Sequence, residues 1–378
     1  MTCLLTALCA ASEKEKIDYT GYAGLVLKHS NNINNSSPSK SDEMFGFEAG
    51  IDGVYSTAEN IELKLKTSIL KELYSATENY SGFIFHPEIQ VENSNIIFKI
   101  GHNYTDSFED YETGISTTRD KYLLNNTYLS AMTELFTKTD VKIVFDYLNY
   151  NYSGNIYNDR TEKTTDASVD YNFYGNSKFL AGLSVNSISF AENFDFQNNI
   201  EFRLYTGISG NVSQNAKGDI KFGIRRKNYK SLNDVTKPFF AFNLENAFSK
   251  KLNGKIGFSY DIYTNDFYDY NPGIPGNRYY EKSLLSFSGK YDLNEKERIT
   301  ACFSFARKTY SDLKNVVMPA DKFFDYSTEY ERKISYKKLN FTVGAGLRYF
   351  TKRIAPDEVK LNNQYEGFDI TSKILFNF

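Results

Sequence analysis

Runs of residues that alternate between apolar and polar recur along this 378-residue chain, and they restrict its fold more than any other feature. Clear examples are the segments 61–69, 200–204, 220–224, 255–262 and 339–347. A period of two is typical of a β-strand, because successive side chains of a strand point to opposite faces. Most runs extend for roughly 10–14 residues, whereas strands of soluble proteins average about 5–6 and a tilted membrane-spanning strand needs about 9–11. The pattern therefore predicts strands long enough to cross a membrane.

Composition supports the same class of fold. The chain has 31 Phe, 30 Tyr and no Trp, yet 24% of its residues are charged and its mean hydropathy is −0.49. It contains no apolar run of about 18 residues, which excludes a helical membrane protein. In a transmembrane β-barrel only every second residue of a strand meets lipid, so a polar average and many aromatics are compatible. We therefore expect an all-β fold, namely a transmembrane antiparallel up-and-down β-barrel.

The connections between the runs predict the number of strands. Short polar turns are expected near 56–59, 93–95, 137–140, 175–177, 214–217, 250–254, 294–297 and 333–337. Longer links are expected near 30–42, 73–81, 106–120, 153–164, 191–197, 228–237, 265–278, 311–321 and 351–364. Short and long connections alternate, as in outer-membrane barrels with short periplasmic turns and longer extracellular loops. The alternation predicts about 18 strands with both chain ends on the periplasmic side; 16 is the alternative, because the segment 121–136 breaks the period.

The end of the chain points to a more specific resemblance. Residues 371–378 alternate in the same way, and the last residue is Phe378. This ending resembles the closing strand of the Gram-negative outer-membrane β-barrel superfamily, which includes porin-like proteins and whose terminal aromatic is read by the barrel-assembly machinery. The resemblance implies that Phe376 and Phe378 form an assembly signal and that the protein lies in the bacterial outer membrane. Outer-membrane lipid and the assembly machinery are then its expected partners.

The beginning of the chain indicates export. Residues 3–11 form a short apolar segment that ends in small residues, and the charged segment 12–16 follows. This is the pattern of the second half of a secretory signal peptide. We therefore expect residues 1–12 to be a signal peptide, incomplete at its start, and residues 13–378 to form a single outer-membrane β-barrel domain. Removal of the signal leaves Cys302 as the remaining cysteine, so no internal disulfide is expected.

Strand parity assigns a face to each charged residue. Large apolar residues such as Phe45, Phe202 and Phe376 share one parity, and the charged residues share the other. A charge that faces lipid at the middle of a membrane costs about 2–4 kcal/mol, so the charged parity is expected to face a water-filled lumen. The pore-lining candidates are Glu48, Lys64, Lys99, Asp146, Asp170, Arg203, Arg225, Glu245, Asp261, Lys290, Asp325, Glu329, Arg348 and Lys373. A structural ion pair in the wall is the simpler interpretation of each, and a part in ion preference is the alternative.

Glycines on the lumen parity of the strands allow two interpretations. Examples are Gly50, Gly101 and Gly182. They either relieve crowding on the concave wall or widen a passage for a solute. The sequence does not separate these alternatives.

Enzymatic, metal-binding and nucleic-acid functions find no support. The three histidines, His29, His86 and His102, do not have a metal-ligand spacing. The chain contains no nucleophile elbow, phosphate-binding glycine loop or Cys-x-x-Cys motif. Its net charge of −3 gives no reason to expect nucleic acid. We therefore expect no catalytic residue, no metal and no cofactor.

Two functions remain. The first is a porin-like channel for passive diffusion of small hydrophilic solutes or ions through a mixed-charge lumen, because barrels of about 16–18 strands leave an aqueous lumen. The second is a non-conducting adhesin or structural barrel, which the short loops disfavour. The chain departs from the porin pattern in its third long link, 106–120, which is shorter than the loop that porins fold into the barrel. The sequence leaves the solute and the oligomeric state open.

Overall fold

The computed structural model describes thirteen segments of the chain: residues 16–31, 41–57, 60–75, 79–93, 95–108, 121–153, 159–191, 198–230, 234–264, 279–311, 321–336, 339–354 and 365–377. The signal peptide predicted at 1–12 and the terminal Phe378 lie outside them. Within them the chain forms the strands β1 (Lys16–Ser30), β2 (Asp42–Ser56), β3 (Ile61–Tyr74), β4 (Tyr80–Asn93), β5 (Ile96–Phe108), β6 (Lys121–Phe136), β7 (Thr139–Tyr152), β8 (Arg160–Tyr174), β9 (Ser177–Phe190), β10 (Asn199–Asn211), β11 (Ala216–Tyr229), β12 (Val235–Ala247), β13 (Leu252–Thr264), β14 (Tyr279–Asp292), β15 (Glu297–Ser311), β16 (Asp321–Tyr336), β17 (Leu339–Ile354) and β18 (Tyr365–Asn377). No helix in this part of the chain is long and apolar enough to cross a membrane.

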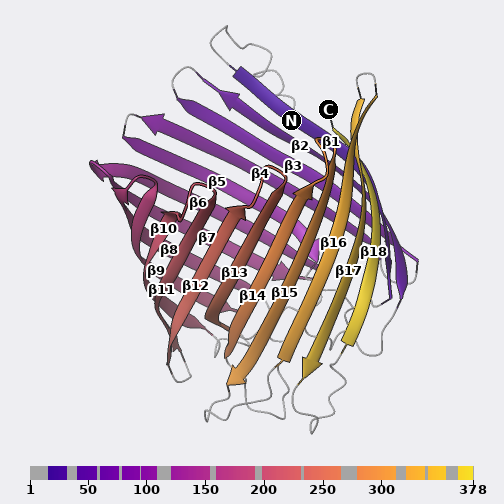
Figure 1. Cartoon of the computed structure of the whole chain (residues 1–378). Coiled ribbons are helices and arrows are strands. Elements are labelled where there is room, and N and C mark those ends of the chain that lie inside the picture. The colour runs from indigo at the N-terminus through magenta and orange to yellow at the C-terminus, as the bar shows by residue number, and fades with distance from the viewer. Residues whose placement is uncertain are drawn as a thin grey trace.

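The strands form one closed antiparallel barrel (Figure 1). Each strand pairs with the next along the chain, and β18 pairs with β1. In the closing pair Leu25 lies opposite Ile374. Closure gives every described strand a partner on both sides, as a bilayer without hydrogen-bonding groups requires. The predicted fold class is confirmed, with 18 strands and not 16.

Connection lengths alternate between the two rims of the barrel. Eight connections between the described strands have two to four residues, and β1 begins and β18 ends at the rim where these lie (Figure 1). The other nine have five to fourteen residues. We call the two ends the short-turn rim and the long-connection rim. The predicted alternation is confirmed, although the connections 75–79 and 230–234 are shorter than expected because the strands beside them extend further.

The segment 121–136, whose period is broken in the sequence, forms the continuous strand β6. It pairs along its length with β5 and with β7. Its irregularity lies near its end, where the register shifts between Glu134 and Phe136, just before the tight turn in which Lys138 has a φ of 76°. Pairing with two neighbours therefore overrides the weak local pattern.

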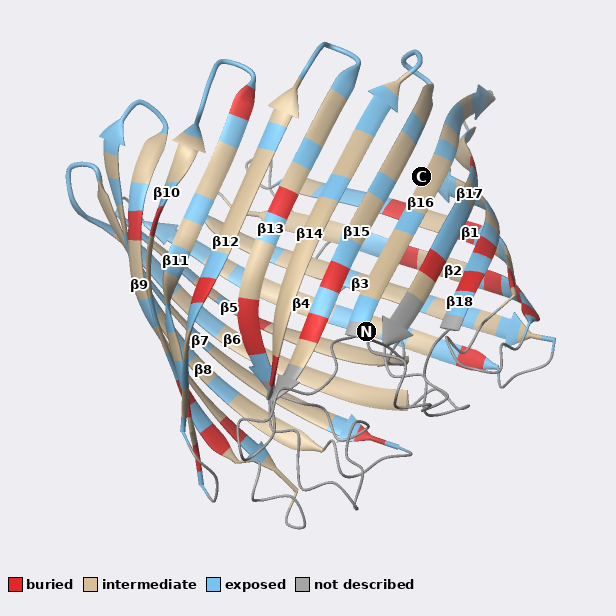
Figure 2. Ribbon diagram, turned by 60° about the horizontal axis from the view of Figure 1, so that its bottom comes forward, coloured by how far each residue is buried: buried red, intermediate tan, exposed pale blue. Residues whose placement is uncertain are grey.

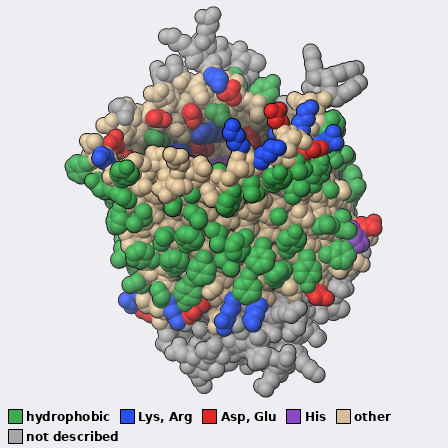
Figure 3. Space-filling model, viewed as in Figure 1, with side chains coloured by type: hydrophobic (Ala, Val, Ile, Leu, Met, Phe, Trp, Pro, Cys, Tyr) green, Lys and Arg blue, Asp and Glu red, His purple; other side chains and the backbone are tan. Residues whose placement is uncertain are grey.

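Large apolar side chains cover the outer wall. Phe45, Phe202, Ile224, Leu347 and Phe376 are exposed there, on the parity assigned to lipid. Figure 3 shows such side chains as a band around the visible face, with Lys, Arg, Asp and Glu gathered at both of its edges. An apolar band flanked by charges is the surface expected of a barrel that lies in a bilayer.

Most of the described buried residues lie in the half of the barrel next to the long-connection rim (Figure 2). Examples are Phe239, Ile262, Tyr280 and Phe350, together with the charged Lys227. The packed side chains of the barrel therefore lie mainly in this half.

Three inward glycines are covered by a tyrosine of the neighbouring strand. The register sets Tyr22 opposite Gly50, Tyr128 opposite Gly101 and Tyr205 opposite Gly182. In each pair the tyrosine ring occupies the space that a Cβ on the glycine would need. An aromatic packed over a glycine of the next strand stabilises a sheet. At these three positions the glycines relieve crowding, which is the first of the two sequence interpretations.

Two prolines interrupt the hydrogen-bonded ladders. The pairing of β4 with β5 stops after Phe85 and resumes at Glu88, on either side of Pro87. The pairing of β12 with β13 begins only at Phe240, so the part of β12 that contains Pro238 does not pair with β13. Proline lacks a backbone N–H and cannot donate a ladder hydrogen bond. Both interruptions therefore follow from the sequence.

Candidate functional site: the charged inner wall

The fourteen pore-lining candidates have the parity opposite to most of the exposed apolar residues of their own strands. They are Glu48 on β2, Lys64 on β3, Lys99 on β5, Asp146 on β7, Asp170 on β8, Arg203 on β10, Arg225 on β11, Glu245 on β12, Asp261 on β13, Lys290 on β14, Asp325 and Glu329 on β16, Arg348 on β17 and Lys373 on β18. Figure 3 shows a hollow at the short-turn rim in which basic and acidic side chains gather. That these residues line a pore stays a prediction.

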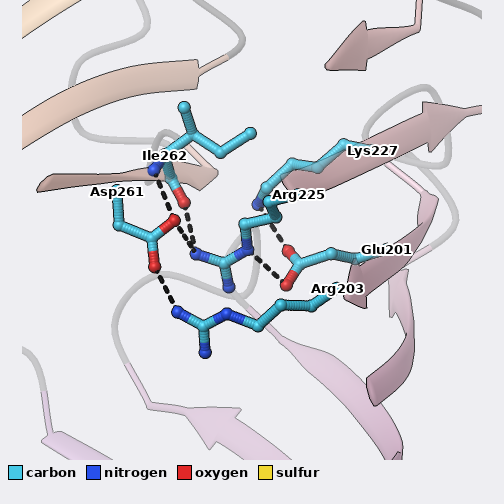
Figure 4. A network of polar contacts seen from close by, with 6 residues as sticks. All are labelled: Glu201, Arg203, Arg225, Lys227, Asp261 and Ile262. Carbon is cyan, nitrogen blue, oxygen red and sulfur yellow. Dashed lines mark hydrogen bonds and ion pairs between the residues drawn. The ribbon is translucent and has the colours of Figure 1, made fainter. Parts of the chain in front are cut away.

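Arg203, Arg225 and Asp261 belong to one ionic network (Figure 4). The Arg225 guanidinium donates from Nε to Glu201 Oε1 at 2.5 Å and lies 2.9 Å, through Nη1, from Asp261 Oδ1. Arg203 Nη2 donates to Asp261 Oδ2 at 2.5 Å, and Lys227 Nζ lies 3.0 Å from Glu201 Oε2. The side chains of Arg225 and Lys227 are only 15% and 2% exposed. Carboxylates therefore replace water around these two cations, and removal of one partner would leave a buried charge uncompensated.

Arg225 also compensates for the ladder interruption beside Pro238. If the β12–β13 register continued past its first pair, Pro238 would lie opposite Ile262. The Ile262 carbonyl accepts a hydrogen bond from Arg225 Nη1 at 2.6 Å, and the Ile262 N–H donates to Asp261 Oδ1 at 2.8 Å. Because proline cannot supply the donor, the side chains of an ion pair satisfy backbone groups that the ladder leaves open.

Aromatic rings lie beside this network. The Arg225 Cζ is 5.8 Å from the centroid of the Tyr263 ring, which stacks on Tyr280 with centroids 5.4 Å apart. On the other side of Tyr280, Lys308 Nζ lies 4.7 Å from the ring centroid. Cations over aromatic faces contribute about 0.5–2 kcal/mol, more where water is excluded. The wall from β10 to β15 is thus both basic and aromatic near the long-connection rim.

Lys64 lies in a second cluster on β3, β4 and β6. Its Nζ is 3.1 Å from Glu88 Oε1 and 3.3 Å from Glu62 Oε2. Tyr128 donates a short hydrogen bond to Glu88 Oε2, and His86 Nε2 lies 3.1 Å from the Tyr128 hydroxyl oxygen. The same tyrosine that covers a glycine is therefore held in place by a carboxylate.

Four further candidates pair on β16, β17 and β18. Lys373 Nζ contacts Glu329 and lies 2.9 Å from Glu331 Oε1. Arg348 donates from Nε to Asp325 Oδ2 at 2.8 Å. The side chain of Arg348 is 45% exposed, so water screens this pair more than the pairs around Arg225.

The remaining candidates have weaker partners or none among the described residues. Asp170 Oδ2 lies 3.9 Å from Lys178 Nζ. No ion pair within the described segments involves Glu48, Lys99, Asp146, Glu245 or Lys290. The structure therefore joins nine of the fourteen candidates to a charged partner and gives these five no ion pair within the described segments.

Acidic and basic residues of inward parity lie on different parts of the barrel wall, whereas the sequence predicted a lumen in which they are mixed. At described positions of inward parity, acids outnumber bases more than twofold from β2 to β8, and bases outnumber acids more than twofold from β9 to β15. In the first set, the acidic arc, the acids are Asp42, Glu48, Asp52, Glu62, Glu72, Glu88, Glu92, Glu134, Asp140, Asp146, Glu162, Asp166 and Asp170, and the bases Lys64, Lys66, Lys99, Lys142 and Arg160. In the second set, the basic arc, the bases are Lys178, Arg203, Lys217, Lys221, Arg225, Lys227, Lys237, Lys255, Lys282, Lys290, Arg298 and Lys308, and the acids Glu201, Asp219, Glu245, Asp261 and Asp292.

The structure brings into the clusters several residues that are not among the pore-lining candidates. Parity predicts the inward face for Glu201, and the same signal was sufficient to find Lys227. Tyr128 gives no such signal, because its role depends on its register with Gly101 and on Glu88. Within the described segments no group of three or more His, Cys, Asp or Glu side chains could hold a metal ion.

The predicted assembly signal is placed only in part. Phe376 is exposed on the outer face of β18, and its ring centroid lies 5.8 Å from that of Phe341 on β17. Phe378 lies outside the described residues. The role of both in assembly stays a prediction.

Comparison with known proteins gives similarity in structure but not in sequence. No family model and no curated protein matches the chain. The outer membrane protein OpdK of Pseudomonas aeruginosa, in its crystal structure with vanillate, is similar with a TM-score of 0.55 at 9% identity, over 96% of this chain and 99% of that chain. OccK2 (OpdF) of the same organism gives 0.54 at 11% over 96% and 98%, and OccAB3 of Acinetobacter baumannii gives 0.51 at 11% over 96% and 100%. Together with the closed 18-stranded sheet, these similarities show that the chain has a porin-like barrel fold, the fold of these outer membrane proteins.

Proposed function

We propose that the protein is an outer-membrane channel through which small hydrophilic solutes or ions diffuse passively. The observation that carries the proposal is the separation of the acidic arc from the basic arc on the inward parity of the wall. Ion pairs that only stiffen a wall need both signs within about 4 Å of each other. Arcs in which one sign is in excess leave charges such as Asp146 and Lys290 without such a partner in the described chain, and a charge without a partner favours contact with water.

Opposed arcs also suggest how the passage would treat solutes. Fixed charges of opposite sign on two sides of a lumen create a field across it. Cations are drawn to one side and anions to the other, so a channel of this kind conducts both with weak overall preference. The excess of positive charge in the basic arc suits a small carboxylate, and vanillate, with which OpdK was crystallised, is a suitable trial solute.

Single-channel recording of the refolded chain in planar bilayers tests the proposal. We expect stable open steps, a reversal potential close to zero under a salt gradient, and a lower current when vanillate is added. Heat-denatured protein from the same preparation is the control for detergent artefacts. A barrel that is folded, as shown by its heat-modifiable migration on gels, but gives no steps would contradict the channel and favour a non-conducting surface barrel.

A further inference from the structure

Two basic residues lie side by side on the lipid-facing wall, apart from the inner wall. Arg307 on β15 and Lys322 on β16 are direct partners in the register. Both are exposed, and each has the parity of the exposed aromatic residues of its own strand. The register carries the row of basic positions on to Arg353 of β17. We call Arg307 and Lys322 the outer basic pair.

The outer basic pair has no counter-charge within the described chain. No ion pair or hydrogen bond among the described residues involves either side chain. Like charges directly opposite in an antiparallel sheet, with Cβ atoms about 4.5–5.5 Å apart, destabilise it. Arg226, another outward cation near the same rim, differs because it lies 2.9 Å from Asp234 and donates to Asn228 at 2.7 Å. An anion from outside the chain would relieve the repulsion in the outer basic pair.

The position of the outer basic pair along its strands, and the surface next to it, indicate which kind of anion would bind there. Lys322 is the second residue of β16, so the pair lies toward the long-connection rim, where the apolar band ends and basic side chains gather (Figure 3). One step toward the membrane centre on the same face, Phe305 lies opposite Phe324. The Phe324 ring also meets Phe303 edge-on, with centroids 5.1 Å apart. The cations thus border a lipid-facing aromatic surface.

We propose that this site binds a phosphate-bearing amphiphile of the outer leaflet. Its phosphate lies between Arg307 and Lys322, and its acyl chains lie along Phe305 and Phe324. An arginine fork matches two phosphate oxygens, and a lysine adds a point charge. The acyl chains add apolar contact, which a free phosphate ion lacks. The long-connection rim faces the outer leaflet because short turns are periplasmic in this class of barrel. The proposal does not depend on conduction.

Native mass spectrometry of the full refolded chain in detergent tests this site. The probes are diphosphoryl lipid A, the same lipid A with its phosphates removed, and inorganic phosphate. The test variant is Arg307→Gln with Lys322→Gln, and Arg226→Gln is the matched control at the same rim. We expect the parent chain and the control to retain diphosphoryl lipid A at least fivefold better than the double variant does. We expect dephosphorylated lipid A and inorganic phosphate to be retained at least fivefold less by the parent chain.

Three results would overturn the proposal. The first is equal retention of diphosphoryl lipid A by the double variant, and the second is equal retention of the dephosphorylated lipid by the parent chain. The third is displacement of the lipid by equimolar inorganic phosphate, which would make the pair a site for free anions. If the double variant does not reach the heat-modifiable form, the single variants and the two lipids on the parent chain decide the question.

Discussion

The basic arc and the acidic arc use the same sequence pattern, a charge on the inward parity, in different ways. In the basic arc, Arg225 and Lys227 are buried and held by Glu201 beside an interrupted ladder. In the acidic arc, Glu48 and Asp146 make no ion pair with any described residue. Burial converts a charge into a structural element, because its partners must replace water, whereas a hydrated charge stays available to solutes. Stability should therefore respond to the buried, paired charges, and ion preference to the charges that make no ion pair.

The largest expected effect on stability comes from Arg225→Met. Loss of the guanidinium removes one of the two cationic partners of Glu201 and of Asp261, and it leaves the Ile262 carbonyl without the donor that Arg225 supplies. The free energy of unfolding should therefore fall by about 3–5 kcal/mol. Urea unfolding of the refolded protein in micelles measures it. Arg203→Met is the matched control, because Arg203 is 34% exposed and, among the described residues, forms an ion pair only with Asp261. Equal losses in the two variants would contradict the special role of Arg225.

A smaller loss is expected in the acidic arc from Gly101→Ala. The new methyl group occupies the space of the Tyr128 ring and displaces a hydroxyl that donates to Glu88, so unfolding should become about 1–3 kcal/mol easier. The same urea titration applies. Gly289→Ala is the control, since a Cβ there meets nothing within 4 Å. A loss of similar size at Gly289 would mean that any strand glycine is sensitive.

Pro238→Val should partly rescue the first variant. Valine restores an N–H opposite Ile262, so in the Arg225→Met background it should recover about 1 kcal/mol of unfolding free energy, the usual net contribution of one hydrogen bond. In the parent chain, where Arg225 already donates to that carbonyl, the gain should be close to zero. A double-mutant cycle measures the difference. Equal effects in both backgrounds would show that the arginine does not replace the missing donor.

The smallest effect on stability is expected where the effect on conduction is clearest. Glu48→Gln with Asp146→Asn removes two acids that make no ion pair with a described residue, so the unfolding free energy should change by less than about 0.5 kcal/mol for each. The reversal potential under a salt gradient should move toward anion preference, because cations lose an attraction on that side. Lys290→Gln should move it the opposite way. Shifts of the same sign in both variants would refute the assignment of the two arcs.

Much of the fold could be predicted from the sequence because parity is a local property. The alternation that ends in Phe376 and the alternating connection lengths predicted a barrel of about 18 strands, and the structure decides for 18 against the alternative of 16. The separation of charge was also present in the sequence, since acids dominate 42–170 and bases 178–308, but it becomes visible only when successive strands are taken as neighbours in a ring.

What escaped prediction depends on register. Nothing in the sequence indicates that Arg225 reaches Ile262 past Pro238 or that Tyr128 covers Gly101, because each contact joins different strands at one exact height. A shift of one residue in register would turn each side chain to the other face. Ion pairs that cross two intervening strands, such as that of Arg203 on β10 with Asp261 on β13, are even less accessible to local patterns.

The pairing of β18 with β1 has a consequence for how the barrel forms. Every other strand pair joins neighbours in the chain, so each can grow as a hairpin with a short loop to close. The β1–β18 pair, in which Leu25 lies opposite Ile374, joins the first and last strands. Its formation closes a loop that contains all the other strands, so its entropic cost is the largest of any strand pair. Folding therefore resembles the rolling of an open sheet whose last, slowest event is this single closure. A circular permutant opened in the turn at Gly175 would keep every strand pair and move that slow event to β8 and β9.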